Sequence, residues 1–167
     1  PSLVVCPSSL IYNWEDEVHK FSQTLPVTCI VSDANTRNTM IHAICGKHLY
    51  VTSYDYIRRD IELYDAIEFE YVILDESQYI KNQKTKNATS VKQLHALHKL
   101  ALSGTPIENS LAELWSVFDF LMPQYLYNYH YFQKKFETDI VKNQDQKKIQ
   151  QLQKMVSPFI LRRNKKD

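Results

Sequence analysis

Two adjacent carboxylates, Asp75 and Glu76, are the side chains of this sequence best suited to do chemistry. They follow residues 71–74, a run of large apolar residues typical of a strand buried on both faces of a parallel sheet. Doubly wound folds bind ligands at the carboxyl ends of such strands. The pair therefore suits nucleotide hydrolysis, in which one acid holds hydrated magnesium and the other positions the attacking water. In the alternative interpretation, an acid here only caps the next helix.

Three more predicted strands end in small polar residues. These are Pro7, Ser8 and Ser9; Thr52, Ser53 and Tyr54; and Ser103, Gly104, Thr105 and Pro106. Because the carboxyl ends of parallel strands meet at one edge of a sheet, we expect the sets to lie close to the two acids. Small hydroxyl residues and free backbone N–H groups suit phosphate oxygens. Helix capping is the alternative explanation for each set.

Strand and helix patterns alternate along the first three quarters of the chain, which predicts an α/β domain with a mainly parallel sheet. The expected strands are 3–6, 27–31, 48–51, 71–74 and 100–102, and the expected helices are 10–21, 34–45, one ending near residue 64, 85–95 and 111–121. Leu10, Trp14, Val18 and Phe21 recur at helical spacing and predict a buried face. Trp115 is likewise expected in the core, behind a helix that Ser110 caps.

The composition is that of an ordinary globular protein, with 44% hydrophobic and 23% charged residues among 167. No apolar run approaches the roughly 18 residues that a membrane span needs. Three cysteines without metal-type spacing are interpreted as reduced, intracellular core thiols. Charge is uneven: residues 1–133 carry ten basic and fifteen acidic residues, whereas residues 134–167 carry ten and four. The basic tail suits either a solvated helix or a nucleic-acid contact.

The chain holds only two glycines, Gly46 and Gly104. A phosphate-binding loop of the G-x-x-x-x-G-K-[ST] type needs two glycines five positions apart, so this sequence does not contain one. The sequence also opens almost directly on a predicted strand. We therefore expect a piece of a longer protein that starts after its first strand and helix.

Five stretches resemble, in family order, motifs of the SWI/SNF-type ATPases, a branch of the superfamily-two helicases. Residues 3–17, LVVCPSSLIYNWEDE, resemble motif Ia, and residues 50–55, YVTSYD, resemble motif Ib. Residues 72–82, VILDESQYIKN, resemble motif II with the I-K-N typical of this branch. Residues 102–123 are similar to motif III and its extension, the most specific match. Residues 159–167, FILRRNKKD, resemble the stretch that leads toward a second lobe.

The resemblance implies a RecA-like, P-loop NTPase-type three-layer fold with a C-terminal helical extension. Residues 1–123 would form part of the first ATPase lobe, 124–157 the helical extension, and 158–167 a basic linker toward a second lobe. The implied activity is that of a DNA-stimulated ATPase that moves along duplex DNA and remodels bound proteins. It implies ATP and Mg as cofactors. It also implies an intracellular location: the nucleoid of a bacterium, which the composition favours, or a eukaryotic nucleus.

The resemblance also implies roles for individual residues. Asp75 would coordinate Mg through water, and Glu76 would activate the attacking water. Gln78, where many relatives have histidine, would link the nucleotide site to motif III, meaning Ser103, Gly104 and Thr105; its amide can do so without titrating. The expected contacts with the DNA backbone are Pro7, Ser8, Ser9, Thr52, Ser53 and Lys81.

Two departures from the family pattern bear on activity. Ser77 stands where alanine or glycine is commoner, which a small position should tolerate. More important, the sequence lacks the phosphate loop and the second lobe with its arginine fingers, on which phosphoryl transfer depends. We therefore expect this stretch alone neither to hydrolyse ATP nor to bind it well. The alternatives for the whole protein are an RNA helicase of the DEAD/DEAH type and a nonenzymatic RecA-like platform that binds proteins.

Overall fold

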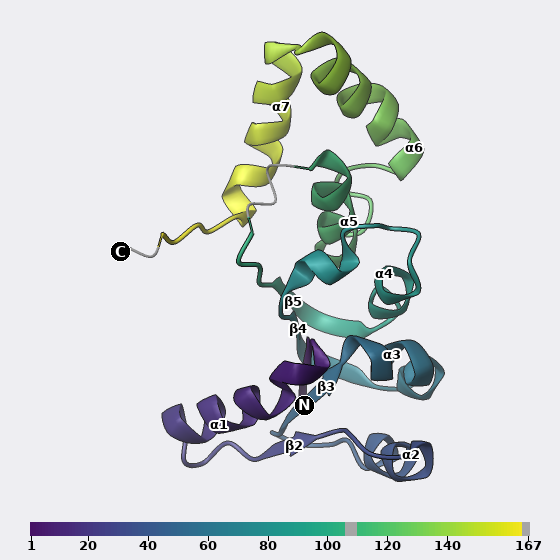
Figure 1. Ribbon diagram of the computed structural model, residues 1–167, viewed down its shortest axis with the longest axis vertical. Helices are drawn as coiled ribbons and strands as arrows, with labels where there is room; N and C mark the ends of the chain where they lie inside the picture. The colour runs from purple at the N-terminus through teal and green to yellow at the C-terminus, as the bar shows by residue number, and fades with distance from the viewer. Residues whose placement is uncertain (106–109, 165–167) are drawn as a thin grey trace. The chain divides into compact units, whose positions relative to one another are not determined.

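The computed structural model describes residues 1–105 and 110–164 (Figure 1). The chain divides into two compact units, Pro1–Pro123 and Gln124–Asp167, and each is described by itself. Pro106 to Asn109, part of the predicted motif III extension, lie outside the described residues. So do residues 165–167 of the predicted basic linker.

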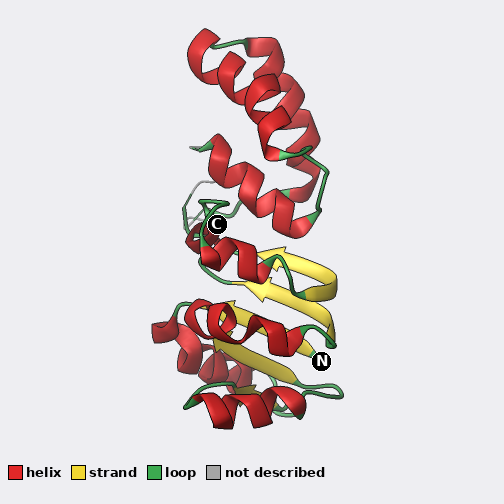
Figure 2. Cartoon of the chain, turned by 90° about the vertical axis from the view of Figure 1, so that its right-hand side faces the viewer, coloured by secondary structure: helices red, strands yellow, loops and turns green. Residues whose placement is uncertain are grey.

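A five-stranded sheet in the order β2-β3-β1-β4-β5 forms the centre of the first unit (Figures 1 and 2). Its strands are β1 (Ser2–Cys6), β2 (Val27–Cys29), β3 (Leu49–Ser53), β4 (Glu68–Leu74) and β5 (His95–Ala101). Every pairing is parallel; Cys6 lies beside Ser53, and Leu74 lies beside both Val5 and Ala101. The prediction of an α/β fold with a parallel sheet is confirmed.

The described α-helices of this unit begin at side-chain caps, except the first, which follows a 3₁₀ turn and has no side-chain cap. They are α1 (Ile11–Phe21), α2 (Ala34–His42), α3 (Tyr54–Asp60), α4 (Lys86–Val91) and α5 (Leu111–Leu121), with short 3₁₀ turns η1 (Ser8–Leu10), η2 (Ile61–Tyr64) and η3 (Ser77–Ile80). The Ser110 hydroxyl accepts the backbone N–H of Glu113 at 3.3 Å, which confirms the predicted cap of α5. Asp33, Ser53 and Thr85 cap α2, α3 and α4 in the same way.

Helices cover both faces of the sheet because alternate strand residues point to opposite sides. Val4, Cys6 and Val51 pack beneath α1, together with its residues Ile11, Trp14 and Val18 and with Cys29 and Leu49. The other face carries the larger core, in which strand residues such as Leu3, Val5, Val72 and Leu74 meet α2, α3, α4 and α5. Trp115 of α5 is buried, as the sequence predicted.

Several sequence predictions fail in detail, and the strand expected over 100–102 begins at His95. The helix expected over 85–95 ends at Val91, because the next residues turn and His95 pairs with Glu68 as the first residue of β5. Phe21, expected in the core, is the last residue of α1 and is 80% exposed. Cys6 and Cys29 are buried free thiols, and burial raises the pKa of each to about 12, but Cys45 is exposed.

The regular elements described in the second unit, residues 124–164, are all helical. They are α6 (Tyr129–Phe132), the π-helix η5 (Gln133–Lys142), α7 (Gln146–Val156) and the 3₁₀ turn η6 (Ser157–Phe159). Phe132 and Phe136 are fully buried with their rings 5.5 Å apart, and Leu152 and Val156 of α7 are also buried. Within residues 1–105 and 110–164, none of the helices has the length and apolar character needed to span a membrane.

Candidate functional site

Asp75 and Glu76 lie at the carboxyl end of β4, between the ends of β1 and β5. The Asp75 N–H donates to the Val5 carbonyl at 2.8 Å, and the Ser77 N–H donates to the Leu102 carbonyl at 2.8 Å. These bonds extend the sheet pairing through the acid pair. Glu76 itself adopts a left-handed conformation, with φ 50° and ψ 56°. A residue other than glycine holds this conformation only where its surroundings enforce it, and such positions cluster at functional sites.

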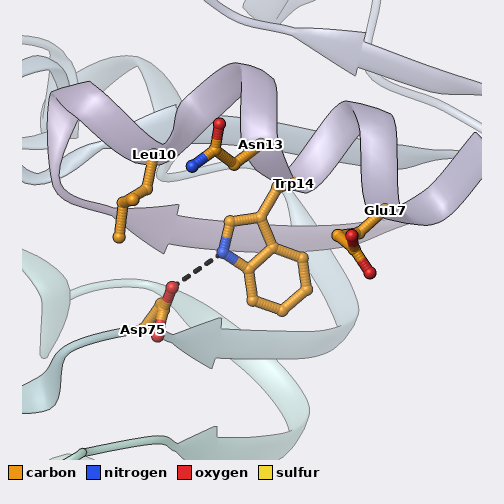
Figure 3. A pocket seen from close by; sticks show the side chains of 5 residues that line it. All are labelled: Leu10, Asn13, Trp14, Glu17 and Asp75. Atoms are coloured by element: carbon orange, nitrogen blue, oxygen red, sulfur yellow. Dashed lines mark hydrogen bonds between the residues drawn. The ribbon is translucent and has the colours of Figure 1, made fainter.

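Asp75 accepts hydrogen bonds from three donors on three segments, and Figure 3 shows the one from Trp14. Its Oδ1 accepts the backbone N–H of Glu76 at 2.9 Å, and its Oδ2 accepts the indole Nε1–H of Trp14 at 2.8 Å. The hydroxyl of Tyr54, the first residue of α3, donates to the Asp75 carbonyl at 2.7 Å. Burial, and then the nearby Asp75 charge, raise the pKa of Tyr54, so this hydroxyl stays a donor.

Gln78 connects the acid pair to the segment that follows β5. Its Nε2 donates to Glu76 Oε2 at 2.5 Å, and its Oε1 accepts the Ser103 hydroxyl at 3.2 Å. Ser103 Oγ lies 3.0 Å from Thr105 Oγ1. The structure therefore brings together Glu76, Gln78, Ser103 and Thr105 in one hydrogen-bonded chain. Gly104 lies between the last two and is exposed.

The site suits Mg²⁺ held partly by water and phosphate rather than by protein ligands alone. Among the residues that the structure describes, no group of three or more His, Cys, Asp or Glu side chains could hold a metal ion. Mg²⁺ is commonly bound through one or two carboxylates, with water and substrate phosphates completing its octahedron. The half-buried Asp75 carboxylate meets this need, since each of its oxygens keeps accepting capacity beyond the one donor that it already has.

The residues predicted to contact DNA differ in exposure. Ser8 and Ser9 are exposed in η1, and Lys81 is exposed directly after η3. Pro7 is buried, as are Thr52 and Ser53. The all-parallel sheet places all of these segments at the edge that carries the acid pair, as the sequence predicted.

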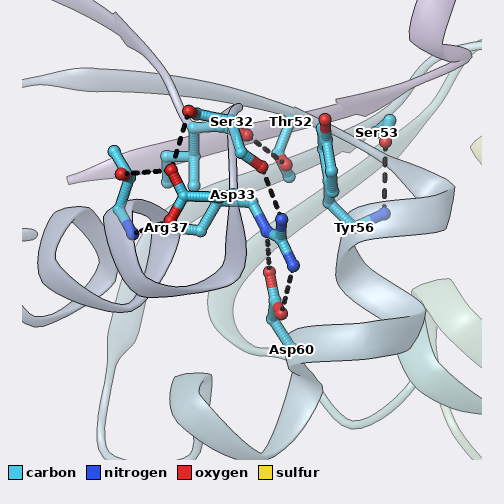
Figure 4. Close-up of polar contacts among 9 residues, drawn as sticks. Ser32, Asp33, Arg37, Thr52, Ser53, Tyr56 and Asp60 are labelled. Carbon is cyan, nitrogen blue, oxygen red and sulfur yellow. Dashed lines mark hydrogen bonds and ion pairs between the residues drawn. The ribbon is translucent and has the colours of Figure 1, made fainter.

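The hydroxyls of Thr52 and Ser53 have partners inside the protein (Figure 4). Thr52 Oγ1 donates to the Ile30 carbonyl at 3.0 Å, whereas Ser53 Oγ accepts the N–H of Tyr56 at 3.2 Å and caps α3. These two side chains thus have structural roles at the edge of the sheet. Their contact with DNA stays a prediction.

A buried ion pair joins α2 to the end of α3 next to these residues (Figure 4). Arg37 Nε and Nη2 donate to the two carboxylate oxygens of Asp60 at 2.7 and 3.1 Å, and Arg37 Nη1 donates to the Ser32 carbonyl at 2.6 Å. The guanidinium also lies 4.4 Å from the ring centre of Tyr56. The hydrogen bonds to Asp60 raise the pKa of Arg37, which therefore remains charged. The pair fixes the surroundings of the β3–α3 junction.

Ser77, which follows the acid pair, offers a test of the packing at this site. Its side chain is fully buried, and its hydroxyl has no hydrogen-bond partner within residues 1–105 and 110–164. A buried hydroxyl without a partner typically costs about 1–3 kcal/mol. We expect Ser77→Ala to raise the free energy of unfolding by about 1 kcal/mol, measured by urea denaturation. A lower unfolding free energy in this variant would show that the hydroxyl has a stabilising partner.

Sequence reasoning missed Trp14 as a member of the site, and it expected Tyr54 near the acids without giving it a role. Trp14 was expected in the core; its ring does pack there, but it is only half-buried and its N–H binds Asp75. The sequence did carry one signal. Indole N–H groups usually have a partner when buried, and the helix of Trp14 follows a strand that could lie beside the strand preceding Asp75. For Tyr54, only its place directly after a predicted strand end was informative.

The whole chain, residues 1–167, matches the SNF2-related domain family. The chain belongs to this family. It is 39% identical to the Sulfolobus solfataricus SWI2/SNF2 ATPase core solved in complex with dsDNA; the match covers 100% of this chain and 34% of that one, with a TM-score of 0.88. The sheet of this SNF2-related domain is therefore that of a RecA-like ATPase core, which confirms the predicted fold.

Its curated relatives are much longer than this SNF2-related domain. It is 38% identical to TATA-binding protein-associated factor MOT1 of Saccharomyces cerevisiae, over 100% of this chain and 10% of that protein. It is also 38% identical to the putative ATP-dependent helicase/translocase YwqA of Bacillus subtilis, over 100% of this chain and 18% of that protein. The chain thus spans a tenth to a fifth of the length of these relatives.

Proposed function

We propose that the protein containing this chain is a DNA-stimulated ATPase that couples ATP hydrolysis to movement along duplex DNA. The observation that carries the proposal is the hydrogen-bonded chain from Glu76 through Gln78 to Ser103, at the carboxyl ends of β4 and β5. Membership in the SNF2-related family, and the dsDNA bound by the Sulfolobus ATPase core, support the same function.

In this proposal the two acids divide the work of hydrolysis. Asp75 would hold Mg²⁺ through water, and a bound Mg²⁺ would neutralise charge on the phosphates of ATP. Glu76 would accept a proton from the attacking water. Its left-handed backbone ends the extended run of β4, and the Gln78 amide donates to one of its oxygens. Gln78 would transmit the nucleotide state to Ser103, Gly104 and Thr105 without changing its own charge.

Contacts with DNA would lie at the same edge of the sheet. Ser8, Ser9 and Lys81 are exposed there and can reach phosphate oxygens, which suits a motor that must follow any sequence. Pro7, Thr52 and Ser53 would also meet the DNA backbone, and their buried side chains would hold their segments in place for these contacts. The proposal includes a second RecA-like lobe in the same protein, a DNA-bound protein complex as the object of remodelling, and action in the nucleoid or nucleus.

ATP turnover by the full-length protein tests this function. We expect duplex DNA to stimulate steady-state hydrolysis more than single-stranded DNA or RNA of equal length, and we expect the stimulation to fall as salt rises, because phosphate contacts release counterions. If RNA stimulates most, an RNA helicase of the DEAD/DEAH type is the better assignment. If no polymer supports turnover while the protein is folded, the chain is part of a nonenzymatic platform.

A further inference from the structure

Trp14 connects the helix that follows β1 to the acid that follows β4. Its indole Nε1 lies 2.8 Å from Asp75 Oδ2, although the two residues are 61 positions apart in the sequence (Figure 3). Trp14 lies one turn into α1, whose start is joined to the exposed Ser8 and Ser9 by η1. The contact therefore links the segment proposed to contact DNA to the acid proposed to hold Mg²⁺.

The packing of the indole ring fixes the direction in which its N–H points. Its ring lies against the apolar cluster beneath α1, which includes Val4, Cys6 and Val51, all fully buried. An indole nitrogen can only donate a hydrogen bond, and it has a single hydrogen to give. With the ring held by the core, that hydrogen points at one oxygen of a carboxylate. Hydrogen bonds to ionised acceptors are shorter and about twice as strong as those between neutral groups.

A pocket lies beside this contact and leaves space into which the Asp75 carboxylate could rotate. This pocket of about 240 Å³ is lined by Leu10, Asn13, Trp14, Glu17 and Asp75 (Figure 3). Without the indole N–H, Oδ2 would keep no donor from α1, and the carboxylate could rotate into this water-accessible space. Oδ1 alone, held by the neighbouring Glu76 N–H, would not fix the plane of the carboxylate.

We propose that Trp14 is a positioning residue for Asp75: its indole N–H fixes the orientation in which the carboxylate receives hydrated Mg²⁺. The inference rests on the proposed ATPase function and names a residue that acts on the metal site only through Asp75. Partners that orient metal-binding groups typically contribute 10- to 100-fold to metal affinity or activity. A movement of α1 would then alter the metal site through Asp75.

The test is Trp14→Phe in the full-length protein, which removes the N–H and keeps an aromatic ring in the cluster. We expect the Mg²⁺ concentration for half-maximal ATP turnover to rise roughly 10-fold, with turnover largely restored at saturating Mg²⁺. The matched control is Tyr12→Phe, which removes one polar hydrogen from an exposed aromatic residue of the same helix and should leave the Mg²⁺ dependence unchanged. Thermal unfolding of each variant checks that it is folded.

A readout independent of activity comes from ¹⁹F NMR of protein labelled with 5-fluorotryptophan. The resonance that disappears in Trp14→Phe belongs to Trp14. We expect this resonance to shift in Asp75→Asn and again when Mg²⁺ and ATP are added to the wild type. An unchanged Mg²⁺ dependence in a folded Trp14→Phe variant would overturn the inference. So would a Trp14 resonance that shifts neither in Asp75→Asn nor on addition of Mg²⁺ and ATP. Absence of ATP turnover in the wild type would instead overturn the proposed function, and the resonance shift in Asp75→Asn would still report the contact.

Discussion

Asp60→Asn should lower the free energy of unfolding of the first unit by about 3–5 kcal/mol. The side chains of Arg37 and Asp60 are only 6% and 8% exposed, and two hydrogen bonds join them. Asparagine keeps the size of the side chain but removes its charge, so the buried Arg37 guanidinium loses the carboxylate that it is hydrogen-bonded to. That desolvated cation accounts for most of the expected loss. Urea denaturation followed by circular dichroism measures it.

Two further variants separate burial from ion pairing as such. Asp55 also pairs with an arginine, Arg58, at 2.7 Å, but these side chains are 53% and 36% exposed. Asp55→Asn should therefore change stability by less than about 1 kcal/mol. The double replacement Arg37→Met with Asp60→Leu should recover much of the loss from Asp60→Asn, because it removes both buried charges. Equal losses from Asp60→Asn and Asp55→Asn would show that burial of the first pair is unimportant.

Much of the sheet was predictable because two of its strands are apolar runs that are visible in the sequence alone. Residues 3–6 and 71–74 are continuous apolar runs, as expected of strands covered on both faces, and both are central in the sheet. β5 was placed too late because it is an edge strand with mostly half-exposed or exposed residues. Its pairing with β4 determines it, and pairing between segments cannot be read from local periodicity.

The site was predictable in its composition but not in its contacts. Asp75, Glu76 and Gln78 are close in sequence, and Ser103 follows the neighbouring strand, so parallel pairing alone brings them together. The burial of Thr52 and Ser53 depends on how α3 begins and on the Ile30 carbonyl. The bond from Trp14 depends on how α1 packs on the sheet. Hydroxyl and indole groups have several possible partners, and only the packed structure selects one.

Glu76→Gln should lower ATP turnover by roughly two to four orders of magnitude while ATP binding is retained. Glutamine has nearly the same shape, so it can keep the left-handed backbone, and its Oε1 can still accept the hydrogen bond from Gln78. It cannot accept a proton from water at neutral pH. Asp75 is untouched, so the residue proposed to hold Mg²⁺ stays in place. Steady-state hydrolysis with saturating duplex DNA measures the loss, and a fluorescent ATP analogue measures binding.

Glu68→Gln provides the matched control for this prediction. Glu68 is exposed at the first position of β4, at the end of the same strand remote from the site. The same chemical change there should leave both turnover and ATP binding unaltered. If Glu76→Gln keeps more than about a tenth of wild-type turnover, then Glu76 is not the proton acceptor, because a general base typically contributes at least 100-fold. If it loses ATP binding as well, the chain through Gln78 would have to organise the nucleotide site itself, and Glu76 would be part of that framework.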